Sequence, residues 1–180
     1  MAESPLEPEF SRTIRVERIG REEIGRRVEA NPEERQALAV RLGLESLDQL
    51  RAELRIRRLS RDRIAVDGRL EARLTQLCVV SLEPVSSQIE GEFAVEFVEA
   101  GPGPEAEAVV AIDSADPPEP IETGLIDLGE TVVQQLAERI NPYPRAPGAD
   151  VTWQENAPAA SEPKRPFAAL AALRGEKKKG

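Results

Sequence analysis

Residues 64–97 read IAVDGRLEARLTQLCVVSLEPVSSQIEGEFAVEF, and the fold that the sequence predicts is built around this stretch. Before residue 78 and again after residue 84, apolar and polar side chains alternate, which is the period of a strand with one buried face. The apolar parity holds Ile64, Val66, Leu70, Ala72 and Leu74, then Val85, Ile89, Phe93, Val95 and Phe97. The polar parity holds Asp67, Arg69, Glu71 and Arg73, then Gln88, Glu90, Glu92 and Glu96. The two runs and the link 78–84 between them predict a long antiparallel hairpin whose polar face meets solvent.

The segment from Leu47 to Leu59 fits two descriptions. Some of its leucines have helical spacing, but from Leu50 to Ile56 apolar residues alternate strictly with charged ones. The alternation favours a strand that begins near Leu50, and residues 58–63 are short enough for a hairpin connection. This strand and the hairpin then form a three-stranded meander.

Upstream, the segment from Ser11 to Ile19 predicts a first strand, and Arg21 to Ala30 a short turn of helix around Ile24 and Val28. The run Asn31-Pro32-Glu33-Glu34 predicts a helix start, because asparagine caps helices, proline fits their first position, and a glutamate three residues after the cap reaches back to it. This helix should bury Leu38 and Leu42 and stop at Gly43.

Downstream, the sequence predicts a loop and then a second helix. Residues 99–124 are rich in Gly, Pro, Ala and acids, which favours a mobile acidic loop, broken at most by a short strand at Val109 to Ile112. An amphipathic helix should run from Asp127, its cap, to Ile140, before Asn141-Pro142 ends it. Its apolar stripe, which covers the dry face of the sheet, comprises Leu128, Val132, Leu136 and Ile140, with Val133 and Ala137 beside them.

These elements predict an α+β fold, an antiparallel sheet covered by an amphipathic helix. The 180 residues suit a single domain, expected over residues 11–145. A disordered N-terminus is expected over residues 1–10. After residue 145 we expect a stiff proline-rich exit, a linker, a short amphipathic segment at Pro166 to Leu173 and a basic tail over residues 146–180. The chain shows no signal peptide and no run long enough to span a bilayer, so the cytoplasm is the expected compartment.

The composition argues against an enzyme. Without histidine, neither histidine-based acid–base chemistry nor a histidine metal site is available, and we expect no cofactor and no metal. The single cysteine, Cys78, is interpreted as a small apolar residue of the link rather than a nucleophile, because no histidine can activate it. Four acids of the loop suit Mg²⁺ chemically, but a solvated loop is favoured because rigid support is lacking: Asp113, Asp116, Glu119 and Glu122.

Charge is distributed unevenly along a chain whose net charge is −9. Residues 11–73 carry 16 basic and 12 acidic side chains, whereas residues 74–140 carry 1 basic and 14 acidic ones. Arginines concentrate in the strand predicted to begin near Leu50 and in the connection 58–63 after it, where guanidinium groups suit phosphate contacts. The candidate RNA-binding residues are Arg51, Arg55, Arg57, Arg58, Arg61 and Arg63. The alternative is a solvated strand face, partly neutralised by Glu53 and Asp62.

Five segments in order resemble the YceD-like large ribosomal RNA subunit accumulation proteins. They are the link with the residues beside it (77–85), the acidic loop, Ile126 to Glu130, Asn141 to Arg145, and Pro166 to Leu170. The positions that carry the resemblance are Cys78, Leu82, Asp127, Leu128, Pro142, Pro144, Pro166 and Phe167. Many members carry a Cys-x-x-Cys pair at the link, whereas Ser81 stands at the second position here, so no metal role is transferred.

The resemblance implies a non-catalytic factor that promotes accumulation of the large-subunit (23S) ribosomal RNA, and it leaves two mechanisms open. In the first, the arginine-rich strands contact ribosomal RNA or a precursor of the large subunit. In the second, the acidic segment 74–140 shields a basic ribosomal protein, which opposite charge would attract. A hydrolase or nuclease using the loop acids is the control hypothesis.

Overall fold

The two alternating runs form the longest hairpin of the protein, as predicted. The computed structural model describes residues 8–99, 117–121 and 123–149. Strand β4 (Arg63–Leu77) pairs antiparallel with β5 (Pro84–Glu99), with Ile64 opposite Phe97. This register puts the two apolar parities on one face and the two polar parities on the other, because directly opposed residues share a face.

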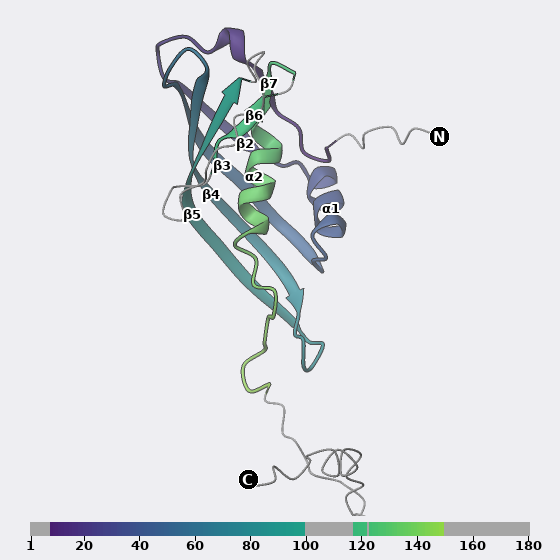
Figure 1. The fold of residues 1–180 in the computed structure, drawn as a ribbon. Coiled ribbons are helices and arrows are strands. Elements are labelled where there is room, and N and C mark those ends of the chain that lie inside the picture. The colour runs from purple at the N-terminus through teal and green to yellow at the C-terminus, as the bar shows by residue number, and fades with distance from the viewer. Residues whose placement is uncertain (1–7, 100–116, 122, 150–180) are drawn as a thin grey trace, which may run out of the picture. The chain divides into compact units, whose positions relative to one another are not determined.

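The hairpin lies within a five-stranded sheet, and Figure 1 shows its strands side by side. The strand order is β2 (Ile24–Glu29), β3 (Ser46–Arg58), β4, β5 and β6 (Glu119–Ile121). All neighbours are antiparallel except β5 and β6, which run parallel. The predicted α+β fold with its β3–β4–β5 meander is confirmed, although β3 begins at Ser46 rather than near Leu50.

The prediction of a helical turn in residues 21–30 is wrong, because this segment contains β2. Ile24 and Val28 lie four residues apart, a spacing that places both on one side of a helix and equally on one side of a strand. Pairing decides between the two, since all of β2 finds partners on β3, with Val28 opposite Ala52.

Two short strands fall at or beside the predicted loop 99–124. They are β6, at the edge of the large sheet, and β7 (Leu125–Asp127), which pairs antiparallel with β1 (Thr13–Arg15). The predicted first strand is limited to β1, because a 3-10 turn, η1 (Val16–Arg18), follows it directly. A strand of three residues is too short to show an alternation of apolar and polar side chains, so such strands cannot be predicted from the sequence pattern. The predicted strand at 109–112 lies outside the described residues.

Helix α1 (Pro32–Arg41) begins as predicted. The Asn31 side chain accepts a hydrogen bond from the Glu34 backbone N–H at 2.9 Å, and the Glu34 carboxylate accepts one from the Asn31 N–H at 2.7 Å. The helix is capped by Leu42, and Gly43 follows with φ of 64°, a left-handed conformation that favours glycine. Leu38 is buried and Leu42 is partly buried against the same core.

Helix α2 (Leu128–Ala137) begins at the predicted cap. The Asp127 carboxylate accepts hydrogen bonds from the N–H groups of Gly129 and Glu130, at 2.9 and 3.2 Å. Glu130, three residues after this cap, does not complete a capping box, and Arg41 holds its carboxylate at 2.6 Å. The helix ends at Ala137, three residues before the predicted end at Ile140. The Ile140 N–H still donates a hydrogen bond to the Leu136 carbonyl at 3.1 Å.

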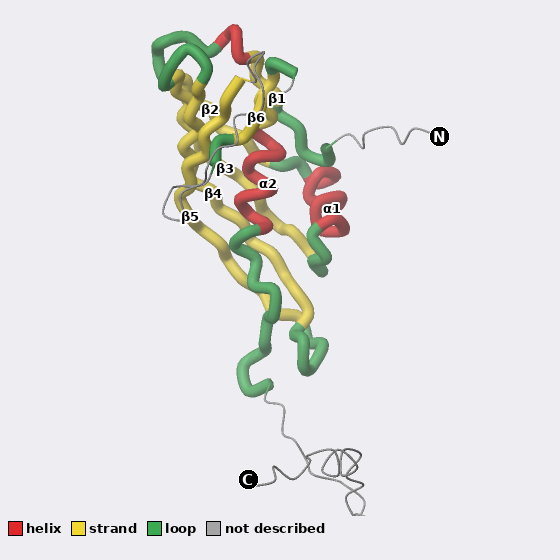
Figure 2. The backbone as a smooth tube through the Cα atoms, in the orientation of Figure 1, coloured by secondary structure: helices red, strands yellow, loops and turns green. Residues whose placement is uncertain are grey.

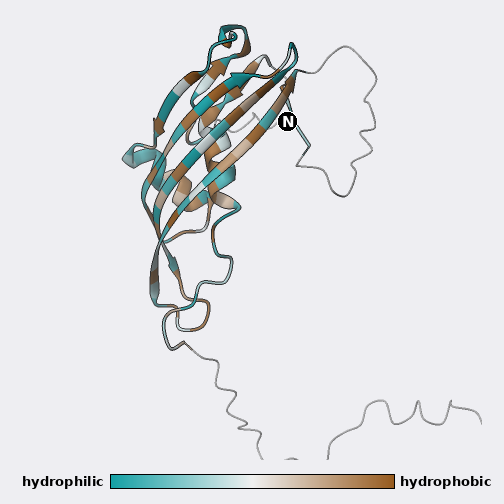
Figure 3. Cartoon of the chain, turned by 90° about the vertical axis from the view of Figure 1, so that its left-hand side faces the viewer, coloured by the Kyte–Doolittle hydropathy of each residue, from teal (hydrophilic) through white to brown (hydrophobic). Residues whose placement is uncertain are grey.

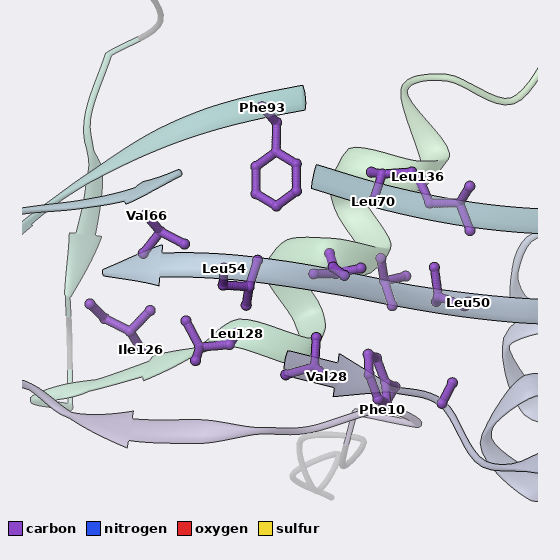
Figure 4. Close-up of a cluster of buried hydrophobic side chains, with 14 of the residues drawn as sticks. Phe10, Val28, Leu50, Leu54, Val66, Leu70, Phe93, Ile126, Leu128 and Leu136 are labelled. Atoms are coloured by element: carbon purple, nitrogen blue, oxygen red, sulfur yellow. The ribbon is translucent and has the colours of Figure 1, made fainter. Parts of the chain in front are cut away.

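Both helices and the β1–β7 pair cover one face of the sheet, here called the closed face (Figures 1 and 2). Between them lies a continuous apolar core, in which Leu136 of α2 is 0% exposed (Figure 4). Burying a leucine of this kind contributes about 1.5–3 kcal/mol. The opposite, open face carries the polar parity, and the ribbons in Figure 3 accordingly alternate between hydrophilic and hydrophobic along each strand.

Phe10 corrects the predicted boundary of the domain. The sequence assigned residues 1–10 to a disordered N-terminus, but Phe10 is 0% exposed and packs in the core beside α2 (Figure 4). A Cβ at Gly129 would lie 2.2 Å from the Phe10 carbonyl oxygen, so the chain passes the first turn of α2 at a distance that only glycine permits. The packed part of the chain therefore includes Phe10. No helix in the described part of the chain is long and apolar enough to cross a membrane.

Candidate functional site

The open face is a mixed array of arginines and carboxylates rather than a basic patch. The strand register places on it the arginines Arg27, Arg51, Arg55, Arg57, Arg63, Arg69 and Arg73. The same face carries as many carboxylates, namely Glu29, Glu53, Asp67, Glu71, Glu90, Glu92 and Glu96. Across one row of four strands the signs alternate strictly, from Arg27 to Glu53, Arg69 and Glu92.

Several arginines of this face are already paired. Arg51 lies directly opposite Glu71 and donates to its carboxylate, and this contact lowers the pKa of Glu71 below its usual value. Arg57 donates to Asp67 at 2.5 Å, and Arg63 lies 3.5 Å from Glu96. An RNA phosphate must compete with these carboxylates for the same donors.

The structure divides the predicted arginine cluster between two places. Arg51, Arg55, Arg57 and Arg63 lie on the open face, whereas Arg58 has the opposite parity. The Arg58 guanidinium donates to the carbonyls of Val16, Ile19 and Arg61, each at 2.8 Å, and so ties the end of β3 to the turn after β1. Its side chain therefore holds the fold together at this end of the sheet.

Two open hollows are lined by arginines, some of which have a carboxylate partner and some of which have none among the described residues. The first, of about 1100 Å³, includes Arg26, Arg27, Arg55, Arg57 and Arg69 among its lining residues. The second, of about 570 Å³, lies where η1 meets the β3–β4 turn and includes Arg15, Arg58 and Arg61. Of these, Arg15, Arg26, Arg55 and Arg61 form no ion pair with another described residue.

Sequence reasoning missed Arg15 and Arg26. No local pattern singles out Arg15, since the arginines at 12, 15, 18 and 21 repeat every third residue, which is the period of neither a strand nor an α-helix. Arg15 lies on β1, which pairs with β7 and is tied to the end of β3 through the Val16 carbonyl. Both partners are distant in sequence, so a local pattern cannot indicate these contacts. Arg26 was missed because residues 21–30 were interpreted as helical, whereas they contain β2, an edge strand of the large sheet.

Charge differs sharply between the strands of the large sheet. Strand β5 carries Glu90, Glu92, Glu96 and Glu99 and no basic residue, whereas β2, β3 and β4 each carry more arginines than carboxylates. One side of the open face is therefore acidic, and it lies along the outermost long strand. The asymmetry that the sequence shows along the chain becomes an asymmetry across the sheet.

The link between β4 and β5 is organised around Cys78, which is buried. Its sulfur accepts hydrogen bonds from the backbone N–H groups of Val80, Ser81 and Ala146, at 3.4, 3.4 and 3.2 Å. The Ser81 hydroxyl and N–H, together with the Ala146 N–H, lower the pKa of the Cys78 thiol to about 6. Cys78 is thus a polar anchor of the link, and its interpretation as merely a small apolar residue was incomplete.

The other positions of the resemblance take different structural roles. Asp127 caps α2, and Leu128 is buried behind it. The Pro144 carbonyl accepts a hydrogen bond from the Val79 N–H at 2.9 Å, which fastens the chain after α2 to the link, while Pro142 is exposed. Leu82 has a left-handed φ of 61° and a side chain that is 70% exposed. Pro166 and Phe167 lie outside the described residues.

The carboxylates considered for Mg²⁺ do not form a site within the described residues. Of the four, only Glu119 is described, on β6, where burial and then the charge of Glu138 raise its pKa. In residues 8–99, 117–121 and 123–149, no group of three or more Cys, Asp or Glu side chains is arranged to hold a metal ion.

A family model described as "Large ribosomal RNA subunit accumulation protein YceD" matches residues 66–174. The chain belongs to the YceD family. The suspected resemblance is thereby confirmed, and the family's description concerns accumulation of large-subunit ribosomal RNA rather than a reaction. No curated protein and no solved structure matches the chain.

The range of the YceD match divides the candidate residues. It begins within β4 and includes β5, its glutamates and α2. All six arginines predicted to bind RNA precede it, as do Arg15 and Arg26. The family match therefore supports the role in ribosome biogenesis but carries no information about the arginines.

Proposed function

We propose that this protein is a non-catalytic, cytoplasmic factor of ribosome biogenesis that promotes accumulation of the large-subunit (23S) ribosomal RNA. The observation that carries the proposal is the YceD match over residues 66–174. Depleting the protein should lower the large-subunit ribosomal RNA relative to the small-subunit RNA, measured on total RNA. Equal amounts of both RNAs in the depleted cells would contradict the proposal.

The contact with RNA is proposed to involve the predicted arginines that keep free donors. Arg55 and Arg61 are exposed, line the two hollows, and pair with no carboxylate among the described residues. Arg51, Arg57 and Arg63 contribute less in this proposal, because a carboxylate lies beside each of them. Neighbouring arginines extend the surface on which a phosphate backbone would lie, chiefly Arg15 and Arg26.

A double substitution tests this contact against a matched control. Arg55→Ser with Arg61→Ser should weaken binding of a fragment of large-subunit RNA and reduce the log–log salt slope by about 0.7–0.9 for each lost phosphate contact. The control is Arg21→Ser with Arg145→Ser, which removes the same charge from two exposed positions that line neither hollow. Equal loss in both variants would show that only net charge matters. Absence of binding at low salt would exclude direct RNA contact.

A second function, capture of a basic ribosomal protein, is favoured by the acidic strand β5. Strand β5 carries four glutamates and no basic residue, and all four glutamates lie inside the range of the family match. An acidic surface of this kind would accelerate the encounter with a highly basic protein and keep it from binding RNA prematurely.

A further inference from the structure

The outer edge of β5 has a long stretch of backbone with no strand beside it in the described part of the chain. Strand β5 pairs with β4 from Pro84 to Val98, but on its other side β6 covers only Phe97–Glu99. The open stretch, residues 84–96, is longer than the usual five or six residues of a strand and contains no proline after Pro84. Such edges are templates for a further strand unless something blunts them.

The direction of the backbone groups along this edge follows from one contact. The Glu92 carbonyl accepts a hydrogen bond from Arg139 at 3.0 Å, outside the β4–β5 ladder, so it points away from β4. In an antiparallel pair the residues whose N–H and C=O face one side alternate. The residues that share this direction are therefore Gln88, Glu90, Glu92, Ala94 and Glu96.

The same residues carry the acidic side chains. Glu90, Glu92 and Glu96 rise on the open face from the positions whose backbone faces the free edge. Glu90 and Glu96 meet arginines of β4 at 3.2 and 3.5 Å, in exposed pairs that bind weakly, and Glu92 forms no ion pair with another described residue. Directly opposite residues of an added strand would come within reach of these carboxylates.

Charge selects the kind of strand that fits. A second copy of β5 would place glutamates opposite glutamates, which is unfavourable. A strand with lysine or arginine at every second residue would instead place a cation opposite each carboxylate. On the closed face, the Arg139 side chain lies against Gly91 of β5. The added strand therefore needs small side chains on its closed-face side, next to Arg139.

We propose that the free edge of β5 binds an extended basic polypeptide segment as an added antiparallel strand. The segment has cations at alternate positions, and its backbone displaces Arg139 from the Glu92 carbonyl. This inference rests on the second proposed function, capture of a basic ribosomal protein, and specifies the surface and the mode of binding.

A synthetic twelve-residue peptide of alternating lysine and threonine tests the geometry. In the proposed register, the lysines opposite the glutamates exchange both backbone hydrogen bonds with β5, whereas the threonine N–H groups point away. Methylating the lysine backbone nitrogens should therefore abolish binding to the full chain. Methylating the threonine nitrogens, which leaves the same charge, should preserve it. Titration calorimetry gives both affinities.

Substitutions on the protein test the charges. Replacing Glu90, Glu92 and Glu96 together by Gln should weaken binding of the unmethylated peptide about tenfold or more, as expected for three cross-strand pairs. The matched control replaces three other exposed glutamates, Glu17, Glu33 and Glu45, by Gln and should change the affinity little.

Amide hydrogen exchange locates the bound strand. Peptide binding should slow exchange at Glu90, Glu92 and Ala94, whereas Gly91 and Phe93, which face β4, should already be protected in the free chain. Protection of the first group without peptide would mean that another part of the chain occupies the edge, and would overturn the inference.

The outcomes separate the inference from the function on which it rests. Equal affinity of the two methylated peptides would overturn strand addition but leave an acidic acceptor of basic proteins intact. No affinity for the unmethylated peptide at low salt would overturn both.

Discussion

In the layer that covers the closed face, Arg12 and Arg41 each hold a carboxylate with two nitrogens, and these are called the closed-face pairs. On the open face, Arg51 and Arg57 each direct two nitrogens at a single oxygen. Arg12 reaches both oxygens of Glu34, at 2.8 and 3.0 Å, and Arg41 reaches both oxygens of Glu130, at 2.9 and 2.6 Å. The first kind of pair fixes geometry as well as charge. The closed-face pairs join elements distant in sequence, while the open-face pairs join neighbouring strands that already have backbone hydrogen bonds. The closed-face pairs therefore hold the fold together, whereas the open-face pairs add little to contacts that the backbone already makes.

Breaking the apolar contact of α2 should have the largest effect. Leu136→Asp places a carboxylate among apolar side chains on the closed face, and we expect a loss of roughly 4 kcal/mol or more in the free energy of unfolding. Urea denaturation measures it. Gln134→Asp, on the exposed side of the same helix, is the control and should cost little. A Leu136→Asp variant as stable as the control would mean that α2 is not docked on the sheet.

Asp127→Ala should have the next largest effect. The Asp127 carboxylate accepts hydrogen bonds from the N–H groups of Arg12, Gly129 and Glu130 and from the Ser11 hydroxyl, so its loss leaves the start of α2 and the chain before β1 without an acceptor. The expected cost is about 2 kcal/mol. Asp127→Asn keeps an acceptor oxygen and should cost less. Equal thermal unfolding of the alanine variant and the parent protein would exclude this junction as a source of stability.

The smallest expected effects are the coupling energies of the two kinds of ion pair, which double-mutant cycles compare directly. A double-mutant cycle with Arg12→Ala and Glu34→Gln should give a coupling of roughly 1 kcal/mol, reduced because the arginine is partly exposed. A cycle with Arg51→Ala and Glu71→Gln should give a smaller coupling that disappears at high salt, since both side chains are accessible to solvent. If the Arg51–Glu71 pair proved the stronger, the distinction between the two faces would fail.

The elements that the sequence predicted correctly are those whose signal is local and repeated. The hairpin of β4 and β5 repeats one alternation over many residues, and α1 carries its capping residues within a span of four. The errors fall where a segment is short. Ile24 and Val28 satisfy a helix and a strand alike, and only the neighbouring β3 determines that they lie on a strand.

The candidate site was predictable in content but not in arrangement. The sequence indicated an arginine-rich strand and an acidic half, and both exist. It did not indicate that Glu71 and Asp67 lie beside Arg51 and Arg57, because such contacts depend on the register between strands. The alternation places Arg58 on the side opposite Arg57, but it did not indicate what Arg58 binds, since the carbonyls of Val16 and Ile19 are distant in sequence.

The sequence alone determined which face of each long strand is dry, because a period of two fixes side-chain direction without knowledge of any partner. It also determined where both helices begin, because capping is an interaction between residues two or three positions apart. Only the tertiary structure decided which charges neutralise one another and which edge of the sheet stays open. Those properties depend on strand order and register, which arise from packing between segments far apart in the chain.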